Sequence, residues 1–239
     1  MNRTTLAILT AWIGVGLGLL PCRPALAETI ERGQAATVPW SGYWWPLRQG
    51  GLVQPLEKYD QITGRQSVSW EHGNRRLGPD APAWFGHCHA WAASAVMERE
   101  PVASHVAAAP QGQPVLLGIG DQKGWLAACH TRDAAHTYGQ RTEEGQEPIG
   151  LAPEVLWRLL RLYVQQHQVP LILDIEPGPE VWNYPVFEYE LVHCPEPEPG
   201  PDSDTDTNGN DDGTPHRATL TLLMSDSGVP PDHVGVKTR

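Results

Sequence analysis

The order of two hydrophobic patterns along the chain constrains its fold more than any other feature. Up to residue 168 most periodic segments have helical spacing, and the clearest, "APEVLWRLLRLYVQQHQ", carries Pro153 in its first turn. Helices are also expected in residues 84–100, beginning near Cys88, and in "DQKGWLAACH", with Asp121 as N-cap. One short strand is expected in "PVLLGIG", and three more follow in "VPLILDIE", "VWNYPVFEYELV" and "ATLTLLMS". Helices followed by antiparallel strands predict an α+β protein.

The N-terminus is typical of a secretory signal peptide. It has an early Arg3, an apolar core over residues 6–20 and the small-residue pattern "ALA" ending at Ala27, where we expect cleavage. An uncleaved anchor is the alternative, but the apolar core is shorter than the ~20 residues that a spanning helix needs. We therefore expect a secreted or periplasmic protein that has no stable membrane insertion after cleavage.

The charge of the chain excludes one class of partner. Residues 28–239 hold 15 basic and 28 acidic side chains, a formal charge of −13, and seven of the acids fall between Pro195 and Gly213. A chain this acidic is not expected to bind nucleic acid. The mature length of 212 residues suffices for one domain with its own core.

The stretch "WFGHCHAWAASA" places Cys88 between two histidines at the expected start of a helix. The unpaired N–H groups and the positive dipole end of a helix N-terminus stabilise a thiolate over a thiol. The cysteine is thus a candidate nucleophile, with a disulfide and a metal ligand as alternatives.

The other cysteines leave the disulfide alternative open. Cleavage removes Cys22 and leaves three cysteines, so a bridge between Cys129 and Cys194 would leave Cys88 free, although sequence does not fix the pairing. A zinc site is disfavoured, because adjacent positions in "HCH" rarely converge on one tetrahedral ion and the chain has no CxxC or HExxH.

Four blocks, "WSGYWWP", "GHCHAWAA", "GDQKGWL" and "EVWNYPV", occur in the order of corresponding blocks in the transglutaminase elicitor family, which this sequence resembles. The resemblance implies a papain-like, transglutaminase-like core in which a Cys-bearing helix packs on an antiparallel sheet. It also implies acyl transfer from a protein glutamine to lysine or another primary amine through a Cys thioester, with calcium dependence. It makes Cys88 the nucleophile and Asp121 its polar partner.

The chemistry of such a reaction needs a general base and a site that limits water. We expect His130 as the general base, with His87, His89 and His136 as alternatives. Tryptophans that wall an acyl site would exclude water and favour an amine as acceptor. We assign substrate binding to Trp84, Trp91, Trp125, Trp182 and the adjoining Asn183, and for each tryptophan separately a core position is the alternative.

The chain departs from the family pattern in two places. Leu156-Trp157 stands where the family has "FH", and the sequence ends at Arg239, short of the family's usual C-terminal region. We divide the chain into the signal peptide 1–27, an irregular Trp-rich N-terminal lobe 28–82, a catalytic core 83–194, an acidic loop 195–215 and a C-terminal strand segment 216–239 that is possibly truncated.

The acidic loop contains the beginning of a calcium-loop pattern. Oxygen ligands are expected from alternate positions, with a turn at Gly209 and with the candidates Asp204, Asp206, Asn208 and Asp212. The twelfth position is Pro215 instead of a bidentate Glu, and a solvated, disordered loop is the alternative.

Three functions follow from these observations. The first is the acyltransferase described above, acting on proteins that bear glutamine and primary amines. The second is a papain-like cysteine hydrolase of peptide or cell-wall amide bonds, which needs the same thiolate but a wetter acyl site. The third is a noncatalytic module whose tryptophans bind carbohydrate or peptide.

Overall fold

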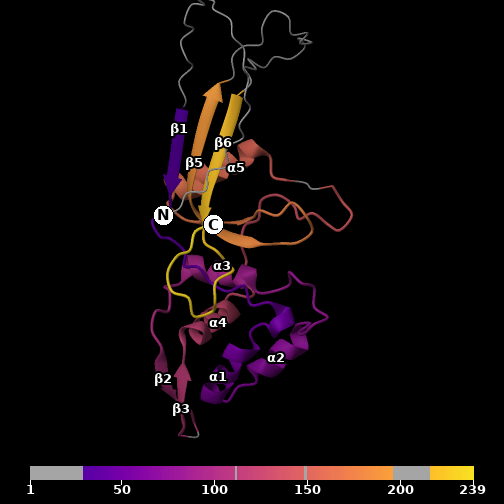
Figure 1. The fold of residues 1–239 in the computed structure, drawn as a ribbon, viewed down its shortest axis with the longest axis vertical. Coiled ribbons are helices and arrows are strands. Elements are labelled where there is room, and N and C mark those ends of the chain that lie inside the picture. The colour runs from indigo at the N-terminus through magenta and orange to yellow at the C-terminus, as the bar shows by residue number, and fades with distance from the viewer. Residues whose placement is uncertain (1–28, 111, 148–149, 196–215) are drawn as a thin grey trace, which may run out of the picture.

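The computed structural model describes residues 29–110, 112–147, 150–195 and 216–239. Its strands and helices form two layers stacked along the long axis of the molecule (Figure 1). The antiparallel sheet is built on β5 (Asn183–Pro195), which pairs with β1 (Thr29–Gln34), β4 (Leu171–Asp174) and β6 (His216–Met224). The expected α+β class with antiparallel strands is confirmed.

A bulge in β5 sets which of its side chains face the core. The pairing with β6 shifts register between Val186 and Glu188. In the core cluster that includes Leu160 and Val164, the β5 positions before the shift are even, Tyr184 and Val186, and those after it are odd, Tyr189 and Leu191. One extra residue reverses the alternation of a strand, so the bulge keeps both halves of β5 on the same core.

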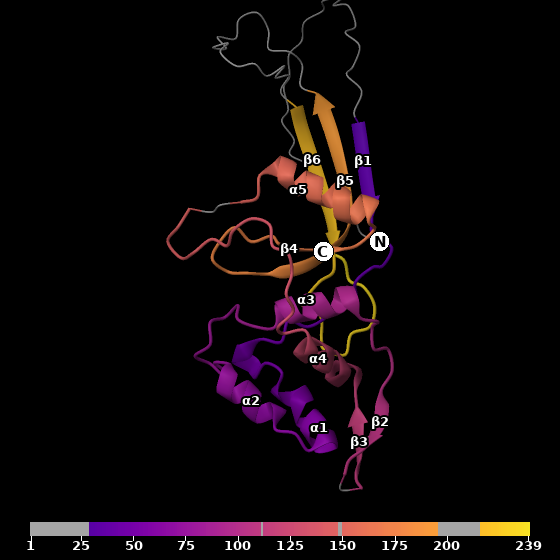
Figure 2. The same cartoon turned by 180° about the vertical axis from the view of Figure 1, so that it is seen from behind.

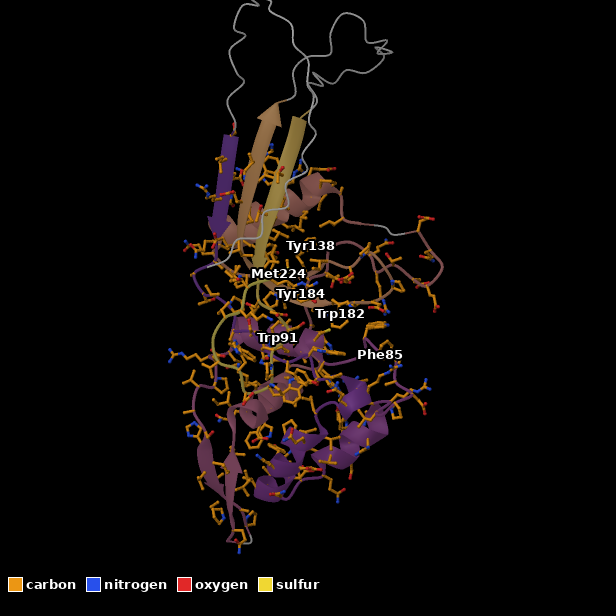
Figure 3. All side chains as sticks on the ribbon, in the orientation of Figure 1. Phe85, Trp91, Tyr138, Trp182, Tyr184 and Met224 are labelled. Atoms are coloured by element: carbon orange, nitrogen blue, oxygen red, sulfur yellow. The ribbon has the colours of Figure 1, made fainter. Side chains whose placement is uncertain are left out.

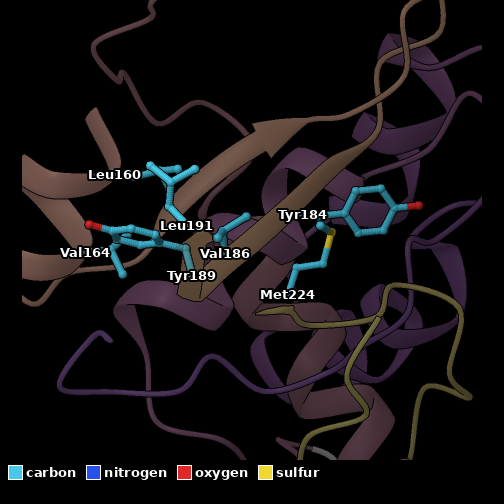
Figure 4. Packing of buried hydrophobic residues seen from close by; sticks show 7 residues of the cluster. All are labelled: Leu160, Val164, Tyr184, Val186, Tyr189, Leu191 and Met224. Carbon is cyan, nitrogen blue, oxygen red and sulfur yellow. The ribbon is translucent and has the colours of Figure 1, made fainter. Parts of the chain in front are cut away.

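That core lies between the sheet and the helical segment that follows residue 152. The segment consists of α5 (Pro153–Leu159) and a π-helical continuation, Leu160–Gln166, and Figure 2 shows α5 across the back of β5 and β6. Its fully buried Leu160 and Val164 lie one turn apart and contact the buried face of β5 (Figure 4).

The second layer is helical. It contains α1 (Val53–Thr63), α2 (Ser67–Asn74), α3 (Cys88–Met97) and α4 (Ile119–Cys129), after a 3₁₀ turn at Leu47–Gln49. A hairpin of β2 (His105–Ala108) and β3 (Pro114–Leu117) extends from it. The helices pack around Trp45 and Leu52 and around Trp40 and Trp91.

The segment after β6 returns to the helical layer and ties the two layers together. The buried Lys123 of α4 donates to the carbonyls of Ser41 and His233, at 3.2 and 2.6 Å, and pairs with Glu100 at 2.6 Å. The Glu100 carboxylate also accepts the N–H of Gly235 at 2.9 Å. The Lys123 ammonium group therefore links α4 to three other parts of the chain.

The structure differs from the expectations in residues 28–82, which hold α1 and α2 instead of irregular structure alone. The buried residues are only Pro55 and Leu56 in α1 and Glu71 in α2. Neither helix therefore has the apolar stripe from which a helix is predicted in a sequence. Residues 29–34 also belong to the sheet as β1.

A smaller correction concerns the start of α4. The N-cap is Gly118, and Asp121 is the third helical residue, with its carboxylate accepting the Gly118 N–H at 2.7 Å. Within the described ranges, no helix has the length and apolar character needed to cross a membrane.

Candidate active site

Cys88 is the first residue of α3, so its thiol lies at the positive end of the helix. His87 is the N-cap, and its N–H donates to the carbonyl of Trp44 at 2.7 Å. No side chain caps the first turn of α3. The N–H groups of this turn are therefore not taken up by a capping side chain, and they can donate to an anion.

The thiol contacts one residue just before β5 and the first residue of β5. Cys88 Sγ lies 3.6 Å from the carbonyl oxygen of Val181 and 3.4 Å from Nδ2 of Asn183. Only 5% of the Cys88 surface is exposed. The nucleophile candidate is thus positioned where the helical layer meets the sheet.

These two contacts have different consequences for the charge on sulfur. A neutral thiol can donate to the Val181 carbonyl while it accepts from Asn183. A thiolate can only accept, so ionisation removes the first hydrogen bond and strengthens the second. Asn183 is therefore the side chain that stabilises a reactive thiolate here.

Two tryptophans from chain segments near Cys88 pack against each other. Trp182, between the two residues that contact Sγ, packs against Trp44 with ring centroids 5.1 Å apart. Figure 3 shows Trp182 at the boundary between the two layers. Gly86 permits this arrangement, because a Cβ atom there would lie 2.5 Å from Cε3 of Trp44.

The tryptophan pair forms one wall of a hollow of about 410 Å³. The hollow is also lined by Tyr184, Glu176, Glu180, Asp226 and Arg239. Cys88, Val181 and Asn183 are not among its lining residues. Trp182 lines the hollow and is the chain neighbour of the two residues that contact Sγ.

Of the four tryptophans expected to bind substrate, only Trp182 lines this hollow. Trp91 is 1% exposed within the helical core, and Trp125 donates to the carbonyl of Pro55 at 2.6 Å. Trp84 packs on Phe85, with centroids 4.4 Å apart. Trp44 was missed, although it belongs to "WSGYWWP", the first block of the family resemblance.

The expected partners of Cys88 are held elsewhere in the structure. Asp121 pairs with Lys58 at 2.5 Å. His130 Nδ1 lies 2.5 Å from Asp133, and its Nε2 lies 3.7 Å from Glu98. In the described part of the chain, no imidazole is hydrogen-bonded to Cys88 Sγ, so the structure does not bring the expected triad together.

A buried ion pair that the sequence did not suggest lies next to the nucleophile. His87 Nε2 is 2.8 Å from Oε1 of Glu71, and each side chain is 1% exposed. Burial acts to raise the pKa of Glu71, but the hydrogen bond and charge of His87 outweigh it, with help from the Leu52 N–H and Arg75, and hold that pKa below its usual value. The pair ties α2 to the N-cap of α3.

His89, in the first turn of α3, is exposed on part of its surface, and protein covers the rest. Burial of its ring, followed by the charge of His87, lowers its pKa. The imidazole is therefore neutral at ordinary pH and can accept a proton.

The disulfide and metal alternatives for the cysteines depend on the state of their thiols and on nearby ligands. Cys88 and Cys129 are free thiols, so the structure lacks the bridge between Cys129 and Cys194 considered above. No cluster of three or more metal-ligating side chains occurs in the described ranges. The calcium candidates Asp204, Asp206, Asn208 and Asp212 lie outside those ranges.

The fold resembles that of a solved transglutaminase structure. The chain is similar to the solved structure of the GP42 transglutaminase from Phytophthora sojae, with a TM-score of 0.56 at 15% sequence identity. The match covers 85% of this chain and 69% of the other. No protein-family model matches the sequence, and no curated protein matches it significantly.

Proposed function

We propose that this protein is a secreted acyltransferase of the transglutaminase type, which joins protein glutamine to primary amines through a thioester on Cys88. The observation that carries the proposal is the position of Sγ, at an uncapped helix N-terminus and 3.4 Å from the Asn183 amide. The similarity to a transglutaminase structure supports the same chemistry.

The first half of the reaction follows from the geometry around Cys88. The thiolate attacks the carbonyl carbon of a glutamine carboxamide, and a C–S bond forms. The N–H groups of the first turn of α3 stabilise the oxyanion. The C–N bond then breaks, and the nitrogen leaves as ammonia after it gains a proton.

In the second half a neutral primary amine attacks the thioester carbon. A C–N bond forms, the C–S bond breaks, and the amine proton passes to the released thiolate or to solvent. Water would hydrolyse the same thioester to glutamate. The packing of Trp182, the residue between Val181 and Asn183, against Trp44 supports amine transfer, because aromatic side chains near an acyl site reduce its access to water.

The proton of Cys88 needs an acceptor. Catalytic hydrogen bonds often tighten only when substrate is bound, so Asp121, from the family resemblance, and His130, from its place in the sequence, stay candidates. His89, already an alternative base, is supported by its lowered pKa and its place in the first turn of α3. Calcium dependence, through the acidic loop, and secretion, through cleavage after Ala27, belong to the same proposal.

Two readouts test the proposal in the purified mature chain. Ammonia release from a glutamine peptide measures thioester formation, and incorporation of a fluorescent primary amine measures transfer, each with and without calcium. We expect both in the wild type and in C129A, which removes the other free thiol, and neither in C88A. Ammonia release without amine incorporation would instead indicate a hydrolase, and no ammonia release would overturn the proposal.

A further inference from the structure

A basic patch made by Trp70, Arg75 and Arg132 lies in the helical layer. Trp70 belongs to α2 and is 39% exposed, Arg75 is the C-cap of that helix, and Arg132 belongs to the segment that follows α4. The guanidinium carbons of the two arginines lie 5.8 and 5.3 Å from the centre of the Trp70 ring. Two positive charges therefore share one indole ring.

Neither arginine of the patch is paired with an anion. Among the residues that the structure describes, no carboxylate oxygen lies within 4.0 Å of either guanidinium. The acids closest to them along the chain are already engaged, because Glu71 pairs with His87 at 2.8 Å and Asp133 with His130 at 2.5 Å. The Nε atom of Arg75 is buried and has no hydrogen-bond partner in the described ranges. An anion that paired with both guanidinium groups would relieve their mutual repulsion.

The patch continues to the first turn of α3 through His89. Burial and then the charge of His87 lower the pKa of His89, while a hydrogen bond with the Thr131 backbone opposes them and the charge of Arg75 adds to them. The His89 ring therefore lies close to both sides of the patch. His89 directly follows Cys88, so an anion bound at the patch lies near the turn that carries the nucleophile.

The chemistry of the patch favours a carboxylate on a protein partner. A planar guanidinium group can form two parallel hydrogen bonds with a carboxylate, and it can stack on an aromatic ring at the same time. The chain as a whole repels an acidic partner, since residues 28–239 carry a formal charge of −13. Attraction at the patch combined with this general repulsion would fix the orientation in which an acidic segment docks.

We propose that Trp70, Arg75 and Arg132 bind aspartate or glutamate side chains of the acyl donor, so that glutamines in acidic protein segments are the preferred substrates. This inference rests on the proposed function, because it concerns the donor of the Cys88 thioester. The three side chains determine specificity and do not act on the reacting atoms. An extended peptide advances about 3.3 Å per residue, so acids several positions away from the reactive glutamine can reach the patch.

The test compares three glutamine peptides of equal length. One carries three glutamates on the N-terminal side of the glutamine, one carries them on the C-terminal side, and the third has serine at all of these positions. For the better acidic peptide, we expect kcat/KM for ammonia release to exceed that of the serine peptide by about tenfold at low salt, mainly through a lower KM. In R132Q this advantage should fall to about threefold, because one of the two guanidinium groups is lost.

A matched variant and a salt series separate the patch from a general change in charge. R99Q also removes one exposed arginine, just beyond the end of α3 that lies opposite Cys88, and it should keep the full advantage of the acidic peptide. High salt should lower the advantage in the wild type, because exposed charges are screened.

Failure of this inference and failure of the proposed function give different results. Equal ammonia release from the three peptides in the wild type, or an acidic advantage that R132Q leaves unchanged, would overturn the patch as a donor site. A dimer that R132Q dissociates, with no preference among the peptides, would instead assign the patch to a second copy of the chain. If the wild type releases no ammonia from any peptide, the acyltransferase is rejected and the donor preference falls with it.

Discussion

The side-chain amide of Asn183 donates to the sulfur of Cys88 at 3.4 Å, across 95 positions of sequence. The bond joins the first turn of α3 to the start of β5, and these two elements belong to different layers of the fold. The position of the nucleophile therefore depends on how the helical layer packs on the sheet.

The first prediction concerns this amide. N183A should lower kcat/KM for ammonia release about tenfold, because one hydrogen bond to a charged group contributes about 1.5 kcal/mol. N183D should lower it further, since a carboxylate beside Sγ repels the thiolate. Steady-state kinetics with the glutamine peptide measures both variants.

Thermal unfolding provides the control for these variants. Asn183 is half-buried at the start of β5, and its replacement by Ala should change Tm by only a few degrees. A wild-type kcat/KM in N183A would show that the amide does not support the thiolate.

The second prediction concerns the pH dependence of stability. The pKa of Glu71 is lowered in the folded protein, so this carboxylate binds protons less readily than it does in the unfolded chain. Its contribution is present above the ordinary Glu pKa and is lost as pH falls through the lowered folded value. The free energy of unfolding should therefore decline below about pH 4.5 more steeply in the wild type than in E71Q.

The same variant should be less stable at neutral pH. E71Q leaves the buried His87 imidazole without its anionic partner, and breaking a buried pair costs about 3 kcal/mol. Urea denaturation at a series of pH values measures both effects. Parallel pH profiles of wild type and E71Q would exclude the pair as the source of the acid dependence.

Much of the fold was predictable because its strongest signals are local. The alternation over residues 187–191 and the helical period after Pro153 each indicate burial of one face, and these segments are β5 and the helix behind it. The start of α3 at Cys88 was predicted from the alanine-rich run and the Gly-ended loop. Helices α1 and α2 were not predicted, because they bury few apolar residues.

The site was predictable only where one residue could be identified by itself. Cys88 stands out through its helix position, whereas its contacts with Val181 and Asn183 arise from long-range packing that no local pattern encodes. The same holds for the pairing of Trp44 with Trp182, which lie far apart in sequence. Asp121 was assigned by resemblance and His130 by its place in the sequence, and the structure gives both of them partners in their own helical layer.

The third prediction concerns the buried Lys123. K123M keeps an apolar stem beside Trp40, whose ring lies 4.4 Å from the ammonium, but leaves Glu100 without its cation. We expect a loss of about 3 kcal/mol, or a Tm lower by about 6–12 °C, because an unpaired charge remains in a largely buried position. K237M, which removes an exposed lysine, should change stability by at most about 0.5 kcal/mol. Equal Tm values for the two variants would contradict the stabilising role of the Lys123 contacts.

The last prediction concerns Gly86, two residues before the nucleophile. A Cβ atom there would lie 2.5 Å from Cε3 and 2.6 Å from the carbonyl oxygen of Trp44, and the backbone oxygen cannot move aside cheaply. G86A should displace Trp44 from the N–H of His87 and shift the start of α3, so ammonia release should fall at least tenfold, since a misplacement of about 1 Å can cost 10²-fold.

The matched control for G86A is G73A, because a Cβ atom at Gly73 meets no atom within 4 Å. Gly73 lies in α2, so alanine there should stabilise the helix by about 0.5–1 kcal/mol and leave ammonia release unchanged. Kinetics and thermal unfolding of both variants measure the contrast. If G86A retained wild-type ammonia release, the contact between Trp44 and the Gly86 backbone would not position the nucleophile, and the tryptophan wall would have to be independent of α3.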